Sequence, residues 1–156
     1  MTRVTAKRFV CGVVILWALD SASSLRAQIP IGTWVKQGEA SAAGALTMTV
    51  EACCNGGRRL IYRINGSGDP LMTIESPMDG RDVPVLVAGK PSGETMGIKL
   101  VDDHHLLAVV KMNGKMFGTS RATLSADGKT LTVENEVTSA AGGQPVGKQT
   151  ETWVRK

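Results

Sequence analysis

Apolar and polar residues alternate along the chain from Trp34 onward, in short runs that turn residues interrupt roughly every 8 to 15 positions. In ALTMTVEA, at positions 45–52, the apolar residues Leu46, Met48 and Val50 occupy every second position. A strand with one buried and one solvated face has this period of two. The same alternation predicts strands at 58–66, 71–76, 77–85, 94–101, 104–112, 115–124, 129–138 and 147–156.

Turn signals separate these predicted strands. Asn113-Gly114 is a strong signal for a two-residue hairpin, and the residues from Asn55 to Gly57 tolerate positive φ. Pro84 confines its short strand to an edge or an end of the sheet, because proline donates no ladder hydrogen bond. About nine strands joined by short loops predict an antiparallel meander with two exposed edges. Since closure removes those edges, the predicted fold is all-β, a single antiparallel meander β-barrel of about 8–10 strands.

The first 27 residues have the pattern of a signal peptide. Basic residues precede an apolar run from Phe9 to Leu19, and small residues follow it up to Ala27. The run is too short to cross a hydrocarbon core, which needs about 20 residues. We therefore expect residues 1–27 to be cleaved and residues 28–156 to form one exported domain, in the periplasm or outside the cell. A retained membrane anchor is the alternative.

Loss of the leader changes the charge balance. It removes four of the 18 basic residues and one of the 14 acidic residues, which leaves a net charge of +1. Arg58-Arg59 is the only basic pair of the mature domain before the terminal Arg155-Lys156. Nucleic-acid binding requires a basic face, so no nucleic-acid partner is expected.

Several stretches resemble the calycin superfamily, which includes lipocalins and fatty-acid-binding proteins. They are Gly32-Thr33-Trp34 on the first strand, the antiparallel meander, and a last strand that ends in an aromatic and a basic residue. The runs MDGRDVPV, TSRATLSADGKTLTVENEV and TETWVRK are also similar to a group of exported bacterial lipocalin-like proteins of unknown function. The resemblance implies a barrel in which Trp34 lies across the closed end and Arg155 packs over its ring.

Two of the three tryptophans mark the two ends of the predicted domain, although aromatic residues make up only 4% of the protein. The first and last strands of a meander become neighbours when the sheet closes. Trp34 and Trp153 are therefore predicted to seal this junction, because large rings bury much apolar surface. A guanidinium of Arg155 stacked on Trp34 would add a cation–π contact.

Methionine suggests a function for the barrel interior. Six methionines remain after removal of the leader, several of them on apolar faces of different predicted strands. The Met side chain fills irregular space and adapts to varied partners. These faces predict either a deformable cavity for a small hydrophobic ligand or a core filled by its own side chains, since small barrels do both. The predicted ligand-binding residues are Met48, Val50, Tyr62, Met72, Met96, Ile98 and Met112.

Cys53-Cys54 permits a vicinal disulfide, free thiols or cross-chain pairing. Consecutive Cα atoms lie about 3.8 Å apart, whereas disulfides prefer about 4.4 Å or more. Neighbouring residues of a strand also point to opposite faces. Although the adjoining Asn55-Gly56-Gly57 would let the backbone distort, this geometry favours free thiols or cross-chain pairing over the vicinal bridge.

The residues from Asp102 to His105 form the only cluster of metal-ligand types in the sequence. A zinc site would need further ligands from elsewhere in the fold, so a polar turn is expected and no metal or cofactor is predicted. A nucleophile elbow, a phosphate loop and a zinc-binding helix motif are all absent from the sequence. No residue is therefore expected to be catalytic.

These patterns together predict a non-catalytic, exported lipocalin-like domain that binds a small apolar or amphipathic ligand. One alternative is a structural or protein-interaction module of the cell envelope with a filled core. Another is a metal or redox protein that uses Cys53, Cys54, His104 or His105. No stable membrane span is expected after cleavage, and the sequence predicts no oligomeric state.

Export generates the first testable prediction. Protein recovered from outside the cytoplasm should have an intact mass that starts at or near Gln28, because peptidase removes the leader after the small residues. Mass spectrometry of the purified protein measures this directly. A mass that retains Met1 and the apolar run would instead indicate a membrane anchor.

Overall fold

A computed structural model describes residues 28–38, 43–140 and 145–156. The expected signal peptide, residues 1–27, lies outside the described residues, so its cleavage stays a prediction. Among the described residues, none forms a helix with the length and apolar character needed to cross a membrane.

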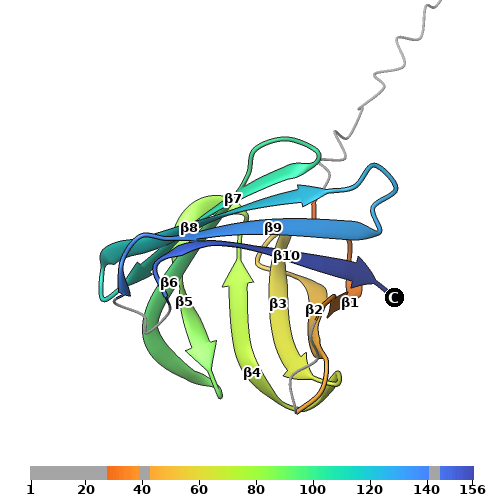
Figure 1. The fold of residues 1–156 in the computed structure, drawn as a ribbon, viewed down its shortest axis with the longest axis horizontal. Helices are drawn as coiled ribbons and strands as arrows, with labels where there is room; N and C mark the ends of the chain where they lie inside the picture. Colours follow the sequence, from red (N-terminus) through yellow and green to blue (C-terminus); the bar gives the residue numbers. More distant parts are fainter. Residues whose placement is uncertain (1–27, 39–42, 141–144) are drawn as a thin grey trace, which may run out of the picture.

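Ten antiparallel strands close into one barrel, which confirms the predicted all-β meander (Figure 1). Each strand pairs with its neighbours in sequence, and the first also pairs with the last. The strands are β1 (Gly32–Lys36), β2 (Leu46–Cys53), β3 (Gly57–Ile64), β4 (Ser67–Ser76), β5 (Asp79–Val87), β6 (Lys90–Leu100), β7 (His105–Met112), β8 (Lys115–Leu124), β9 (Thr130–Val137) and β10 (Gly147–Arg155).

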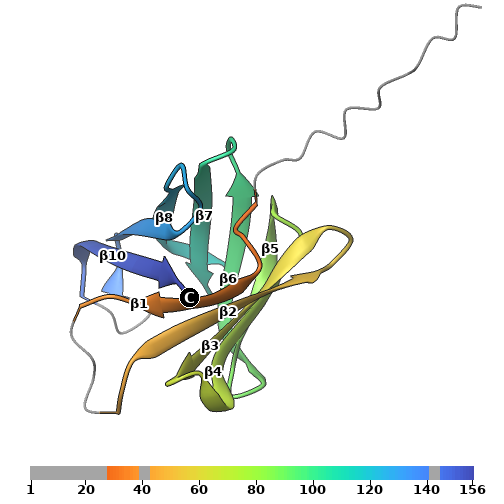
Figure 2. The same cartoon turned by 90° about the vertical axis from the view of Figure 1, so that its right-hand side faces the viewer.

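The two halves of the barrel cross at a steep angle. In Figure 1, β8, β9 and β10 run across the view, whereas β3, β4 and β5 run nearly vertically. Figure 2, turned by 90°, shows β1 between β10 and β2, where the two halves join. The predicted hairpin turn at Asn113-Gly114 joins β7 to β8, and both residues have positive φ, as such a turn requires.

Alternating side chains fill the inside of the barrel. Trp34, Met48, Tyr62 and Met72 are successive cross-strand partners on β1 to β4. Trp34 and Met48 belong to the main hydrophobic core, and the partly buried Tyr62 and Met72 pack against it. A second, smaller cluster of Val110, Phe117 and Val137 packs between β7, β8 and β9. The period-two pattern therefore predicts the inner face correctly on these strands.

The prediction that Pro84 lies on an edge or end strand is wrong. Pro84 lies within β5 and is the cross-strand partner of Thr95 on β6, and a closed barrel has no edge strand. The ladder between β4 and β5 contains only the partners of Val85, Leu86 and Val87, so Pro84 lies just beyond it. The β5–β6 register also shifts next to Pro84. A missing N–H is tolerated at such an irregularity.

The seam between β1 and β10 closes the barrel. Trp34 pairs with Arg155 and Lys36 pairs with Trp153 in antiparallel register. Directly opposite residues of such a ladder share a face, so all four side chains lie on the inner face of the seam. The expected junction of Trp34 with the last strand is therefore present in the structure.

Both seam tryptophans are buried. Trp34 is 0% exposed, and its indole Nε1 donates to the carbonyl oxygen of Pro30 at 3.2 Å. Trp153 is 3% exposed and meets Tyr62 edge to face, with ring centroids 5.8 Å apart. Edge-to-face packing suits the quadrupoles of aromatic rings. The two rings therefore join the seam to the rest of the core.

A short segment before β1 closes one end of the barrel. Ile29 is buried in the core, and three side chains donate to consecutive carbonyl oxygens of this segment. Arg58 Nε donates to Ile29 at 3.0 Å, Trp34 to Pro30, and Arg155 Nη2 to Ile31 at 2.7 Å. The guanidinium of Arg155 thus holds the segment across the closed end. Its stacking on the Trp34 ring stays a prediction.

The seam generates a stability prediction. Trp34→Ala should cost about 3 to 5 kcal/mol of unfolding free energy, the usual loss for a buried large aromatic, and Trp153→Ala nearly as much. Val154→Ala is the matched control, because Val154 follows Trp153 and points to the outer face, and it should cost less than about 1 kcal/mol. Denaturant unfolding measures all three. A loss below about 1 kcal/mol at Trp34 would contradict the sealing role.

Candidate functional site

The barrel encloses a partly open cavity of about 370 Å³. This volume lies at the lower end of the range of about 300 to 1,000 Å³ that small-molecule sites occupy. Of the two interiors that the sequence allowed, the structure has the hollow one. The cavity is lined by Ile29, Leu46, Met48, Leu60, Tyr62, Met72, Met96, Ile98, Leu106, Ala108, Ser120, Ala122, Leu131, Val133, Asn135, Glu151 and Trp153.

The structure brings together five of the seven predicted ligand-binding residues. The cavity lining includes Met48, Tyr62, Met72, Met96 and Ile98. Their side chains come from β2, β3, β4 and β6, so one wall of the cavity is largely methionine and aromatic carbon. Contact with a ligand stays a prediction for all of them.

The other two predicted ligand-binding residues lie outside the cavity lining. Val50 is 0% exposed and lies between Gly32 and Leu60, nearer the closed end. Met112 packs against the second hydrophobic cluster. Both side chains are inside the barrel, as the period-two pattern predicts, but they fill the two ends of the core on either side of the cavity.

Short side chains on β7 and β8 explain why the barrel is not filled. Ala108, Ser120 and Ala122 line the cavity from these two strands. They lie side by side on the inner face, because Ala108 pairs with Ser120 across the ladder. Space that a leucine or phenylalanine would occupy at these positions is left open. The signal in the sequence is the run of small residues at every second position of β8.

One end of the cavity is polar. Ser120 donates its hydroxyl to the side-chain oxygen of Asn135, and both residues line the cavity. Glu151 also lines it, and its Oε1 accepts a hydrogen bond from Lys36 Nζ at 2.7 Å. These polar residues do not appear among the sequence predictions, which considered apolar positions. Extending the inner-face pattern by two residues from Ala122, Val133 and Trp153 would have found Ser120, Asn135 and Glu151.

Tyr62 connects the apolar body of the cavity to its polar end. Burial of the phenol, and secondarily the charge of Glu151, raise the pKa of Tyr62 above its ordinary value. The phenol therefore stays protonated at physiological pH and is a hydrogen-bond donor. Its ring also packs on Trp153, so the hydroxyl is held by a buried framework.

A second carboxylate, that of Glu94, lies on the inner face of β6 but outside the cavity lining. Glu94 is half-buried, is two residues from the lining residue Met96 and pairs with Met112. Burial raises the pKa of Glu94. No cation pairs with its carboxylate among the described residues. The ionised form is therefore desolvated without compensation.

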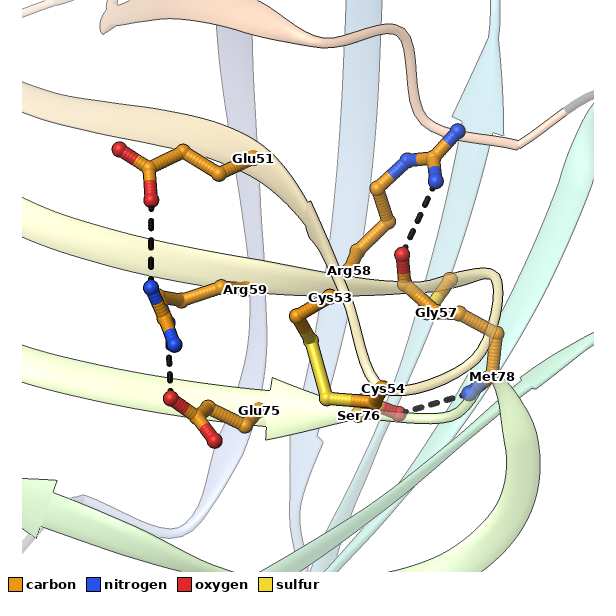
Figure 3. The surroundings of a disulfide bond; sticks show 9 residues. All are labelled: Glu51, Cys53, Cys54, Gly57, Arg58, Arg59, Glu75, Ser76 and Met78. Carbon is orange, nitrogen blue, oxygen red and sulfur yellow. Dashed lines mark hydrogen bonds and ion pairs between the residues drawn. A yellow bond between two sulfur atoms is a disulfide. The ribbon is translucent and has the colours of Figure 1, made fainter.

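Cys53 and Cys54 form a vicinal disulfide, which differs from the favoured prediction (Figure 3). The physical reason is that Cys53 ends β2, and Cys54 and Asn55 both have positive φ, of 54° and 53°. This turn geometry removes the strand alternation that would have separated the two sulfur atoms. The turn fits closely against the next hairpin, because a Cβ on Gly57 would collide with the carbonyl oxygen of Ser76.

The basic pair near this turn has structural partners. Arg59 lies between Glu51 and Glu75 on the outer face of β2, β3 and β4, with its Nε 2.7 Å from Glu75 Oε1 (Figure 3). The hydrogen bond from Arg59 to Glu75 is the main cause that raises the pKa of Arg59. Arg58 donates to Ile29, as described above. Both arginines are therefore engaged within the fold.

The Asp102–His105 stretch forms an exposed turn, in accord with the expected polar turn. Asp102 Oδ1 accepts hydrogen bonds from the backbone N–H groups of His104 and His105, and it lies 2.7 Å from His105 Nδ1. The bond from the His104 backbone is the main cause that lowers the pKa of Asp102. His104 Nδ1 donates to Leu124 O at 3.1 Å. Within the described residues, no group of three His, Cys, Asp or Glu side chains is placed to hold a metal ion.

Comparison of the chain with protein-family models and with curated proteins gives no relative. No protein-family model matches it, and no curated protein does so at a significant level. The cavity and its lining residues are therefore the basis for assigning a function.

Glu94 generates a prediction on pH dependence. A raised folded-state pKa means that the native state binds this proton more tightly than the unfolded chain does. The stabilisation of the folded state by this tighter proton binding is complete below the ordinary pKa of 4.5. It is lost as the pH rises through the higher pKa of the folded state. Glu94→Gln should therefore unfold at higher denaturant than the wild type at pH 7, and the difference should vanish at low pH.

Unfolding midpoints measured from pH 3 to pH 8 would check this. Glu134→Gln on the outer face of β9 controls for the loss of one negative charge. A Glu94→Gln variant that is less stable than the wild type at pH 7 would show that its carboxylate has a stabilising partner.

Proposed function

We propose that the chain is an exported, lipocalin-like protein that binds a small apolar or amphipathic molecule inside its barrel and carries out no covalent chemistry. The observation that supports binding is the partly open, largely apolar cavity of about 370 Å³. Pockets of this kind, with a few converging polar groups, are the usual form of a small-molecule site. The expected signal peptide supports export.

The barrel also supports the lipocalin-like assignment. A closed antiparallel meander with Trp34 buried near one end, and Arg155 opposite it on the last strand, is the arrangement that the resemblance to calycins implies. A completely filled core would have favoured an interaction module instead. The large apolar residues that are exposed lie on separate elements of the fold: Ile31, Leu71, Val87, Val101, Met116, Val146 and Val154.

Cavity volume limits the ligand to a small molecule. At about 30 Å³ for each water-sized unit, a volume of about 370 Å³ holds about a dozen heavy atoms. If such a ligand buries about 300 Å² of apolar surface, the gross gain is about 7 kcal/mol at about 25 cal/mol per Å². The loss of motional freedom on binding offsets several kcal/mol of this gain. The expected dissociation constant is therefore about micromolar or weaker.

Titration with fatty acids, quinones and polarity-sensitive dyes should give saturable binding. Trp153 lines the cavity, so its fluorescence is a direct readout of occupancy. Ala122→Leu should weaken binding at least about tenfold, because the added side chain enters the cavity from β8.

Thr123→Leu is the matched control, since Thr123 is the exposed neighbour on the outer face of the same strand. It should leave affinity unchanged. If no compound saturates a protein shown to be folded, a structural or interaction module would be the better account.

A further inference from the structure

Glu151 is the only charged residue that lines the cavity among the described residues. Its Oε1 is engaged by Lys36 at 2.7 Å, whereas its Oε2 has no hydrogen-bond partner in the described part of the chain. Lys36 is not part of the lining. Of the two residues of this ion pair, only Glu151 therefore faces the cavity, and its Oε2 is available there as a hydrogen-bond acceptor.

Tyr62 supplies a donor to the same space. Its hydroxyl makes no hydrogen bond to any described residue. Among the described residues, every side-chain nitrogen or oxygen atom that is fully buried has a hydrogen-bond partner, so this hydroxyl is not fully buried. The hydroxyl is therefore reached from the cavity, which Tyr62 lines. Because the charge of Glu151 acts on the phenol, donor and acceptor lie at the same end.

Asn135 adds a second donor. Its side-chain oxygen accepts the Ser120 hydroxyl, so the amide nitrogen has both hydrogens available, with no other partner among the described residues. The polar end thus offers one charged acceptor and two neutral donors. A hydroxyl group, which donates one hydrogen bond and accepts others, is complementary to this set.

A carboxylate head group is not complementary to it. Its charge would approach Glu151 in a largely apolar site, where like charges repel more strongly than in water. Lys36 offsets only part of this repulsion, because its ammonium is already committed to Glu151.

We propose that the cavity selects neutral ligands that carry a hydroxyl group, with Glu151 as the acceptor, over fatty-acid anions of the same length. The proposal rests on the proposed function, since it names the ligand class of the same cavity. Tyr62 and Asn135 then donate to the oxygen of the ligand while its apolar tail lies among the methionines.

The test compares 1-decanol with decanoate at pH 8, which share a ten-carbon chain and fit a cavity for about a dozen heavy atoms. Trp153 fluorescence reports both titrations. Wild-type protein should bind decanol at least about tenfold more tightly, the size expected for one hydrogen bond to a charged group combined with repulsion of the anion. Equal or tighter binding of decanoate would overturn the selectivity while leaving the binding function intact.

Glu151→Gln should weaken decanol binding about tenfold and strengthen decanoate binding, so that the preference narrows or reverses. Glu134→Gln removes an exposed carboxylate from the outer face and should leave both affinities unchanged. An unchanged preference in Glu151→Gln would show that Glu151 does not select the ligand. If the wild type binds neither decanol nor decanoate but binds another compound of the panel of fatty acids, quinones and dyes, this proposal is overturned. If it binds none of these compounds, the proposed function is overturned too.

Tyr62→Phe keeps the test independent of the ion pair. The ring should still pack on Trp153, and loss of the hydroxyl should weaken decanol binding several-fold. Full retention of decanol affinity in this variant would show that the phenol does not contact the ligand.

Discussion

The pairing of β1 with β10 turns an open sheet into a barrel, and every interior feature depends on it. Unpaired, these two strands would each expose a row of backbone N–H and C=O groups. The same register buries both seam tryptophans and places Lys36 opposite Trp153. Because Glu151 is two residues from Trp153 on the same face, the ammonium of Lys36 reaches its carboxylate. Closure of the barrel and assembly of the polar end of the cavity are therefore one structural event.

The cavity results from inner side chains of unequal length on a regular surface. Long, flexible methionines extend from β2, β4 and β6, whereas Ala108, Ser120 and Ala122 leave space on β7 and β8. Barrels of this size are filled when large side chains occupy all inner positions. The polar residues lie at one end only, so the cavity has a direction: an amphipathic molecule would place its head toward Glu151 and its tail toward the closed end.

Alternation was sufficient to predict the all-β barrel because each strand has one buried face, and the two tryptophans indicated which strands meet. The cavity could not be predicted in the same way, because its volume depends on side chains from strands far apart in sequence. Ser120, Asn135 and Glu151 were missed because polar residues were assumed to face outward. The disulfide differed from expectation because Cys54 leaves strand geometry with a positive φ, which local spacing does not reveal.

The seam also has a consequence for how the chain folds. Ile31 and Arg155, joined by a hydrogen bond at the closed end, are 124 residues apart. Hairpins between neighbouring strands can form as soon as both strands exist, whereas this contact requires nearly the whole chain to close into a loop. Folding slows as such distant contacts come to dominate, and β1 has no partner on one side until β10 is available. The barrel therefore closes only once β10 has formed, and until then its first strand is open to competing edges.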